Sequence, residues 1–510
     1  MKLFPHVFYS ISKRLLIFLF ALSLVGGALI AALQPPFSAP DEPWHWQTAW
    51  YRFETLGQPQ AKVCNKALGL PNLFQVERIK FKYQESQPSG ILKGLDSAEL
   101  LCVPDDIKPI TYGNFLSYPG VLLARTFSKG ESRSIEKAAM TFFAARMFQL
   151  SLTLLVLFRF VQLAIRSFGE SKRWSFGTLT TLAIVSTPIF LQQASAVSGD
   201  SMVNALAIVL VTLILFWSFV GLPDVLSLTF VGLSAASTKP IVLPAIAATF
   251  LVLLLKNSLF LHKGHRIRFS NTLFELSSLR LDQRILLFGL FALSIFALFV
   301  GMTSSAALSA SLGGIVDPVG QRNFILQNSI KAGAAIWEGS IRHLNFSHFL
   351  GNLGWLDTPL LGNLFDCYLV LFSVAVLVDV VMSLMTGFPR SEIDTWFSVR
   401  RFILSIVFVA GALSSNSLTA FALYLTWTPV GADFVNGLQP RYFLLSFMLV
   451  LVSPSILFGN TREVEKKADS GQQWVWNISS VLNLVMCLAL FLLGAKIVSE
   501  IAFTLAKRYW

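Results

Sequence analysis

Apolar runs of about twenty residues recur along this chain, and they restrict its fold more than any other feature. A helix needs about 20 mostly apolar residues to cross the hydrocarbon core of a bilayer. Charged residues make up only 13% of the 510 residues, whereas a soluble domain carries about 25%. The sequence therefore predicts an all-α polytopic integral membrane protein, folded as a single transmembrane domain over residues 1–510. About eleven runs qualify as transmembrane helices, at 15–33, 140–165, 174–191, 201–220, 225–237, 240–256, 285–304, 363–386, 402–426, 442–458 and 475–498.

Two of these runs allow more than one interpretation. Runs 225–237 and 240–256 are short and are separated only by Thr238, Lys239 and Pro240, so they are either half-helices or a tight hairpin, because proline interrupts helical hydrogen bonding. The first run is longer than the core of a signal peptide, which spans about 7–15 residues. We therefore expect an uncleaved membrane anchor there, with a signal peptide as the alternative.

The distribution of lysine and arginine predicts the orientation in the membrane. These residues gather in alternate short connections, starting with the segment before the first run, and cytoplasmic loops carry such an excess. The rule places the N-terminus in the cytoplasm and two long segments, 34–138 and 305–362, outside. Loops longer than about 60 residues cross the membrane regardless of their charge. The net charge of +12 is thus attributed to topology and not to nucleic-acid binding.

Two cysteines, Cys64 and Cys102, lie in the first long outer loop. An extracytoplasmic compartment is oxidising, so these residues are candidates for a disulfide. Two free thiols are the alternative.

Acidic residues are scarce inside the predicted spans and collect near their outer ends. Ion-coupled transporters place ionisable side chains near the middle of the membrane, and this chain has few there. A functional site is therefore expected at the outer surface. The acids near that boundary are Asp41, Glu42, Asp200, Glu338, Asp357 and Asp433.

The proline-rich segment 34–52, which follows the first run, is the most distinctive local feature. Its prolines stiffen the chain and hold Asp41 and Glu42 close to the membrane, with His45 one helical turn later. A tandem carboxylate placed there suits activation of a hydroxyl beside a lipid-borne substrate. The alternative is that both acids only stabilise the start of an interfacial helix. Four aromatic side chains follow, typical of a belt at headgroup level: Trp44, Trp46, Trp50 and Tyr51.

These residues, one later arginine and five later segments resemble a bacterial membrane-protein family of unknown function whose members are regarded as GT-C-type glycosyltransferases. The resemblance covers nearly the whole chain. One departure is Pro440, which replaces a glycine expected before the arginine and restricts the backbone there. In chain order the matching segments are Asp41 to His45 (DEPWH), Pro109 to Pro119 (PITYGNFLSYP), Arg146, Ser198 to Ser201 (SGDS), Ser237 to Pro240 (STKP), Gly354 to Pro359 (GWLDTP) and Gln439 to Phe443 (QPRYF).

The resemblance implies a GT-C-like fold with a large first extracytoplasmic loop in the bacterial plasma membrane. It also implies transfer of a sugar from a polyprenyl-phosphate donor to a glycan or glycolipid acceptor. Asp41 is the candidate base, with inversion at the anomeric carbon. Glu42 would position the acceptor or share a divalent cation, Mg²⁺ or Mn²⁺, with Asp41, since hard cations prefer carboxylate oxygens.

The remaining candidates would bind substrate, and each has an alternative role. Cationic side chains suit the phosphate; Arg146 is otherwise a snorkelling or interhelix-paired residue, and Arg441 an interface anchor. Asp200 and Asp357 would orient sugar hydroxyls or bind metal; otherwise Asp200 caps a helix and Asp357 forms a turn. The candidates for substrate binding are His45, Tyr112, Asn114, Arg146, Asp200, Lys239, Asp357 and Arg441.

Three other functions compete with this interpretation. A glycan ligase or polymerase shares the outer acid and arginine chemistry. A lipid-linked glycan transporter requires polar residues deeper in the membrane. A non-catalytic assembly protein requires neither.

Overall fold

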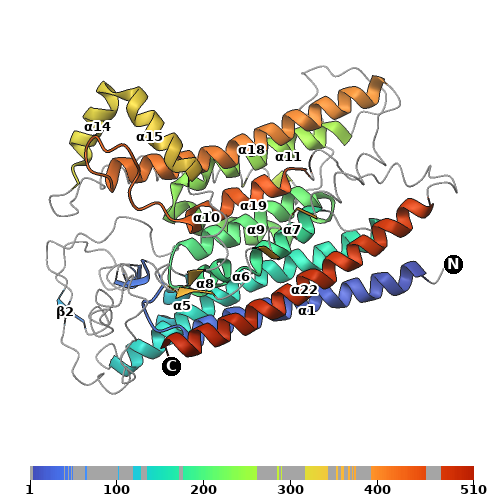
Figure 1. Ribbon diagram of the computed structural model, residues 1–510, viewed down its shortest axis with the longest axis horizontal. Helices are drawn as coiled ribbons and strands as arrows, with labels where there is room; N and C mark the ends of the chain where they lie inside the picture. Colours follow the sequence, from blue (N-terminus) through green and yellow to red (C-terminus); the bar gives the residue numbers. More distant parts are fainter. Residues whose placement is uncertain are drawn as a thin grey trace.

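A computed structural model describes the helical part of the chain and a few short segments between helices. Almost all described residues are helical, and the strands among them are two pairs of two residues each. Most helices run along the long axis, with the amino-terminal end of α1 and the C-terminus at opposite ends (Figure 1). The described residues are 4–39, 41–43, 45–47, 49, 64–65, 101–102, 119–127, 135–171, 176–260, 284–285, 289, 316–342, 352–353, 358–360, 366–367, 370, 373–374, 392–454, 456 and 473–509.

Four described helices are long and apolar enough to cross a membrane, and a bent helix pair makes a fifth candidate. The four are α1 (Phe4–Leu33), α6 (Ile135–Ser171), α18 (Glu392–Thr426) and α22 (Gln473–Tyr509). Each contains one of the runs predicted from sequence, which confirms a helical membrane protein. Runs 285–304 and 363–386 lie largely outside the described residues, so the total of about eleven spans stays a prediction.

Predicted run 174–191 is not one helix, and the prediction of a continuous span there is wrong. It divides into α7 (Phe176–Val185) and α8 (Pro188–Ser195). The break follows from Pro188, which donates no backbone hydrogen bond, and from Thr187, whose hydroxyl accepts from Phe190 N and caps α8. The chain then bends by 118° between α8 and α9 (Asp200–Phe216). The bend places Ser198, Gly199 and Asp200 at one end of the helix bundle.

Helix α9 forms the centre of the structure. Its sequence is apolar nearly all round, and such helices are buried; 16 of its 17 residues are buried. Helices α6, α8, α10 (Leu222–Thr238) and α19 (Leu444–Val452) pack against it. The amino-terminal end of α9 is therefore enclosed by the ends of its neighbours.

The sequence left open how runs 225–237 and 240–256 connect, and the structure describes the break. Helix α10 ends at Thr238, and Lys239 has non-helical angles of φ −135° and ψ 89°. A 3-10 turn, η4 (Pro240–Val242), leads into α11 (Leu243–Phe260). Helix α10 packs on α9 whereas α11 packs on α18. The two are consecutive helices with different partners, and Lys239 lies at their junction.

Further helices lie toward one end of the bundle (Figure 1). Helix α5 (Pro119–Phe127) packs on α6 within the first long loop. Helices α14 (Pro318–Gln327) and α15 (Ser329–Arg342) belong to the second long segment, and α15 packs on α18 (Figure 1). The chain after α18 reaches α19 through the 3-10 turn η6 (Pro440–Phe443).

The first strand pair bears on the predicted disulfide. Strands β1 (Cys64–Asn65) and β2 (Leu101–Cys102) are antiparallel, with Cys64 opposite Cys102. Directly opposed residues have Cα atoms about 4.5–5.5 Å apart, within the range of about 4.4–6.8 Å that a disulfide spans. The backbone register therefore supports the disulfide, which remains a prediction.

Peptide mass mapping tests that prediction. Under non-reducing conditions the peptides containing Cys64 and Cys102 are expected to appear as one linked species, which reduction separates. A Cys64→Ser variant should lose the linked species and leave Cys102 open to alkylation. Identical maps before and after reduction would contradict the pairing.

Candidate functional site

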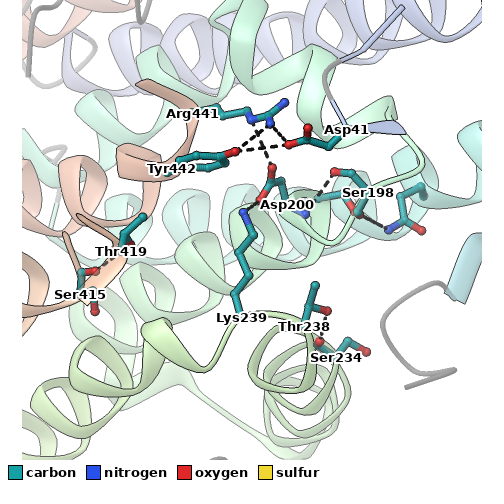
Figure 2. A network of polar contacts seen from close by, with 12 residues as sticks. Asp41, Ser198, Asp200, Ser234, Thr238, Lys239, Ser415, Thr419, Arg441 and Tyr442 are labelled. Atoms are coloured by element: carbon teal, nitrogen blue, oxygen red, sulfur yellow. Dashed lines mark hydrogen bonds and ion pairs between the residues drawn. The ribbon is translucent and has the colours of Figure 1, made fainter. Parts of the chain in front are cut away.

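Four charged side chains from separate parts of the sequence meet at one end of the bundle, and we call them the charge cluster. Asp41 follows α1, Asp200 begins α9, Lys239 lies at the break after α10, and Arg441 lies in η6. Figure 2 shows all four side chains pointing toward one another. The end of the bundle that holds the cluster is the end that the charge distribution predicts to be outside.

Ion pairs join the cluster in an alternating chain. Arg441 Nη2 pairs with Asp41 Oδ2, and Arg441 Nε lies 3.5 Å from Asp200 Oδ2. The other oxygen of Asp200, Oδ1, pairs with Lys239 Nζ. Two carboxylates thus balance two cations, so a bound anion has to compete with the carboxylates for Arg441 and Lys239.

Tyr442 completes the cluster and was not predicted as a site residue. Its hydroxyl accepts a hydrogen bond from Arg441 Nη2 at 3.0 Å and donates one to Asp41 Oδ2 at 3.3 Å. Its ring centroid lies 4.3 Å from Lys239 Nζ and 4.9 Å from Arg441 Cζ, distances typical of cation–π contact. The signal for this residue was its position next to Arg441 in the QPRYF segment.

Exposure distinguishes Asp41 from the rest of the cluster. The Arg441 side chain is fully buried and that of Asp200 is 7% exposed, whereas the Asp41 side chain is 38% exposed. The carboxylate of Asp41 is therefore the acid of the cluster that an arriving molecule reaches first.

The protonation states of Asp41 and His45 follow from their surroundings. Burial alone would raise the pKa of the Asp41 carboxyl, but Arg441, with His45 and Lys239, brings the pKa below its usual value. Burial lowers the pKa of His45 to about 4, although Asp41 and Asp200 act in the opposite direction. At neutral pH Asp41 is thus a carboxylate and His45 an uncharged imidazole. Neither group titrates between pH 6 and 8.

The backbone at Asp41 is held in an uncommon conformation. Asp41 has φ 62° and Phe37 has φ 64°, both in the left-handed region. Aspartate and asparagine enter this region more readily than most residues, whereas for phenylalanine it is rare. Such conformations persist where the surrounding structure enforces them, and they concentrate at functional sites.

A buried ion pair between Glu42 and Arg146 enforces this turn. Arg146 donates from Nε to Glu42 Oε1 at 2.9 Å and from Nη2 to Glu42 Oε2 at 2.6 Å. Its guanidinium also donates to the carbonyls of Gln34 at 2.5 Å and Pro35 at 3.0 Å. Both side chains are almost fully buried, at 2% and 0% exposure. Arg146 is therefore an interhelix-paired residue, one of the two alternatives that the sequence left open.

The carboxylate of Glu42 also connects the segment that carries Asp41 to the segment that carries Asp200. Glu42 Oε2 accepts from Phe37 N at 3.0 Å, and Glu42 Oε1 accepts from Val197 N at 2.9 Å. Val197 lies three residues before Asp200, and Glu42 directly follows Asp41. This geometry favours a positioning role for Glu42 and Arg146, in place of the acceptor or metal contact for Glu42 and the phosphate contact for Arg146 that the sequence suggested.

Polar contacts also fix the turn before α9. Gln149 of α6 accepts from Gly120 N at 3.2 Å and donates to Ser198 O at 3.3 Å. Asp200 N donates to Ser198 Oγ at 3.1 Å. The N-cap position of α9 is Gly199, so Asp200 lies in the first turn of the helix. Its carboxylate pairs with Lys239 instead of capping the helix.

Gly199 allows the approach that brings Asp200 to Lys239. A Cβ atom at Gly199 would overlap the side chain of Thr238, which ends α10. Because Lys239 directly follows Thr238, a larger residue at position 199 has to push the two halves of the ion pair apart. A glycine at position 199 is therefore needed for Asp200 to reach Lys239.

A Gly199→Ala variant tests this inference. The added methyl group should separate α9 from the end of α10, lower the melting temperature and reduce ligand binding at the cluster. The matched control is Gly333→Ala in α15, where a Cβ meets nothing within 4 Å and alanine favours the helix. Thermal unfolding in detergent measures both variants. A Gly199→Ala protein as stable as the control would contradict the packing argument.

One prediction about this region is wrong. Trp46 was expected in an aromatic belt at headgroup level, but its side chain is fully buried. Its ring packs 6.3 Å from that of Phe37 and 5.3 Å from that of Phe142, measured between centroids. Phe142 also lies under the guanidinium of Arg146, 4.7 Å from Cζ. Trp46 therefore belongs to the packing around the Glu42–Arg146 pair.

A small pocket extends from the charge cluster between α9, η4, α18 and the start of α19. Lys239, Arg441 and Asp200 form its charged rim, and Asn204, Ser415 and Thr419 are among its other lining residues. The sequence analysis did not select the last three. An amide four residues after Asp200 and a polar stretch within run 402–426 were the available signals.

Three predicted site residues, Tyr112, Asn114 and Asp357, lie outside the described residues. The predictions for them stay untested. In the part of the chain that the structure describes, no group of three or more His, Cys, Asp or Glu side chains is placed to hold a metal ion.

These observations define a helical membrane protein with a charge cluster where several of its helices end. Comparison with known families gives a more specific identification. Residues 24–450 match the family described as "Predicted membrane protein (DUF2142)", and the chain belongs to this family. No curated protein and no solved structure matches the chain.

Proposed function

We propose that this protein is a GT-C-type glycosyltransferase that moves a sugar from a polyprenyl-phosphate donor to an acceptor hydroxyl. The observation that carries the proposal is the charge cluster, in which the partly exposed carboxylate of Asp41 pairs with Arg441, and Asp200 links Arg441 to Lys239. A transferase of this kind needs a base for the acceptor and positive charge for the departing phosphate. The cluster supplies both within one network.

In the proposed reaction the acceptor oxygen attacks the anomeric carbon from the face opposite the phosphate. The new carbon–oxygen bond forms as the bond from the anomeric carbon to the phosphate oxygen breaks, and the configuration inverts. Asp41 takes the acceptor proton, and the bonding electron pair leaves with the polyprenyl phosphate. A carboxylate with a lowered pKa suffices as the base, because the acceptor oxygen becomes strongly acidic once it bonds to the anomeric carbon.

Arg441 connects the two halves of this reaction. Its guanidinium pairs with Asp41 through Nη2 in the ligand-free protein, and a guanidinium can bind phosphate in a bidentate geometry. When Asp41 accepts a proton it loses its charge, while the leaving phosphate gains negative charge. Arg441 is then released from the acid and attracted to the phosphate, with Lys239 as a second cation, so the interaction strengthens as the reaction proceeds.

The membrane setting of the proposal follows from the charge distribution. Short segments rich in lysine and arginine alternate along the sequence with the segments that carry the cluster residues, and the cytoplasmic side carries such basic segments. We therefore place the site at the outer face of a bacterial plasma membrane. A polyprenyl chain reaches the cluster there by diffusion within the bilayer.

Turnover of a donor panel tests the proposal. Purified protein in detergent and lipid is incubated with different polyprenyl-phosphate monosaccharides and a cell-envelope acceptor fraction, with and without Mg²⁺ or Mn²⁺. Mass spectrometry follows the consumption of donor. Loss of one donor with release of polyprenyl phosphate is expected, and the paired conditions measure the metal requirement. Transfer of whole glycans in the absence of monosaccharide turnover would favour a ligase, and movement across vesicles without chemistry would favour a transporter.

A further inference from the structure

The pocket next to the charge cluster has two walls of different hydrogen-bonding character. One wall carries donors, from the ends of α9, α10 and η6. The other carries hydroxyl groups from α18 and α19. Figure 2 shows the cations of the first wall and, on α18, Ser415 and Thr419 of the second.

The donor wall carries Lys239, Arg441 and Asn204, next to the carboxylate of Asp200. Asn204 is 1% exposed, and among the described residues its Nδ2 atom has no hydrogen-bond partner. Leaving such a donor buried and unsatisfied destabilises the protein, and a ligand with an acceptor oxygen would offset that cost. Three donors thus suit a phosphoryl group.

The hydroxyl wall consists of Ser415, Thr419 and Ser446. Each hydroxyl already donates its proton to a helix carbonyl: Ser415 to Gly411 O at 3.3 Å, Thr419 to Ser415 O at 2.8 Å, and Ser446 to Ala412 O at 2.8 Å. A hydroxyl oxygen retains acceptor capacity after donating its proton. This wall therefore presents acceptors, which suit the O–H groups of a sugar and repel a phosphate.

From this arrangement we propose that the pocket is the subsite for the glycosyl phosphate of the donor. Phosphoryl oxygens bind Lys239, Arg441 and Asn204, and a neighbouring sugar hydroxyl donates to the wall of Ser415 and Thr419. The pocket holds only about 10 Å³ in the ligand-free protein, so a phosphoryl group has to displace the carboxylate of Asp200 from Lys239 to enter. This inference rests on the proposed function and adds to it a residue for phosphate binding, Asn204, and a face for sugar recognition on α18.

Two variants test the two walls of the pocket separately. Asn204→Leu removes the amide donor at similar volume, and Thr419→Val removes one hydroxyl from an otherwise similar side chain. Each has a matched control elsewhere in the bundle. Asn416→Leu removes another buried amide with an unpartnered atom among the described residues, and Thr249→Val removes another buried hydroxyl bonded to its own helix; neither residue lines the pocket.

Binding is measured in an Asp41→Asn background, so that donor is held without turnover. The probes are a polyprenyl monophosphate, the matching polyprenyl-phosphate-linked hexose, and inorganic phosphate. Asn204→Leu should weaken binding of both lipid probes by about tenfold or more, because a hydrogen bond to a charged group is lost. Thr419→Val should weaken binding of the glycosylated probe by about threefold to tenfold and leave the monophosphate unchanged. The control variants should bind both probes normally.

Three results would overturn the subsite. They are unchanged binding in Asn204→Leu, an equal loss for both lipid probes in Thr419→Val, and competition by inorganic phosphate as effective as that of the lipid phosphate. Rejection of the subsite can be distinguished from rejection of the proposed function. Sugar transfer that is unaffected by either variant would reject the subsite alone, whereas the expected binding pattern without turnover of any donor would reject the transferase and retain the subsite.

Discussion

Replacing Asp41 with asparagine is expected to reduce sugar transfer by a factor of about 10²–10⁴, the range in which a general base contributes. The variant should fold normally. Asparagine tolerates the left-handed φ of 62° at this position, and its amide oxygen can still accept hydrogen bonds from Arg441 and Tyr442. The lost quantity is the ability to take the acceptor proton. Initial rates of donor consumption, together with melting temperatures, measure the two effects separately.

An acid near the same end of the molecule serves as the control. Asp433 pairs with Lys331 at 2.8 Å, but its side chain is 78% exposed. Exposed ion pairs contribute little, so Asp433→Asn should keep both the native rate and the native melting temperature. A well-folded Asp41→Asn protein with full activity would remove Asp41 from the mechanism.

Replacing Glu42 with glutamine is expected to have the largest effect on stability. The change leaves the buried guanidinium of Arg146 without its counter-charge, and breaking a buried pair in this way costs about 3–5 kcal/mol. We expect a large fall in melting temperature, measured by thermal unfolding in detergent. Transfer should fall as well, because the carboxylate of Glu42 also holds Phe37 N and Val197 N, beside Asp41 and close to Asp200.

A double variant distinguishes the ion pair from a general effect of substitution. Glu42→Gln combined with Arg146→Met removes both charges, so its loss of stability should be smaller than the sum of the two single losses. Additive losses, or a native melting temperature in Glu42→Gln alone, would contradict the stabilising role of the pair.

The hydrophobic runs predicted the long helices well, because the length and apolar composition needed to cross a membrane are properties of each run alone. Runs 15–33, 140–165, 402–426 and 475–498 all lie within described helices. Run 174–191 was misread because hydropathy averages over a window, and the break at Pro188 falls within an otherwise apolar stretch. The hydroxyl of Thr187 caps α8, and this local contact fixes the break between α7 and α8.

The four charged members of the candidate site were predicted from the sequence, but their pairings and the part played by Tyr442 were not. Asp41, Asp200, Lys239 and Arg441 were each selected from the sequence, on four segments far apart in the chain. Their mutual contacts depend on how α8, α9, α10 and η6 end at one place, and no spacing in the sequence encodes that. The role of Glu42 was obscured for the same reason, because its partner Arg146 lies 104 residues away.

The amino-acid sequence by itself determined that this chain enters a membrane, since the apolar content and the length of its runs leave no other favourable environment. It also determined which end of the helices carries most of the acids. The tertiary structure decided which charges neutralise one another, that Trp46 is buried, and that Asn204, Ser415 and Thr419 line one pocket. These properties depend on side-chain distances of a few ångströms between helices, and only packing sets such distances.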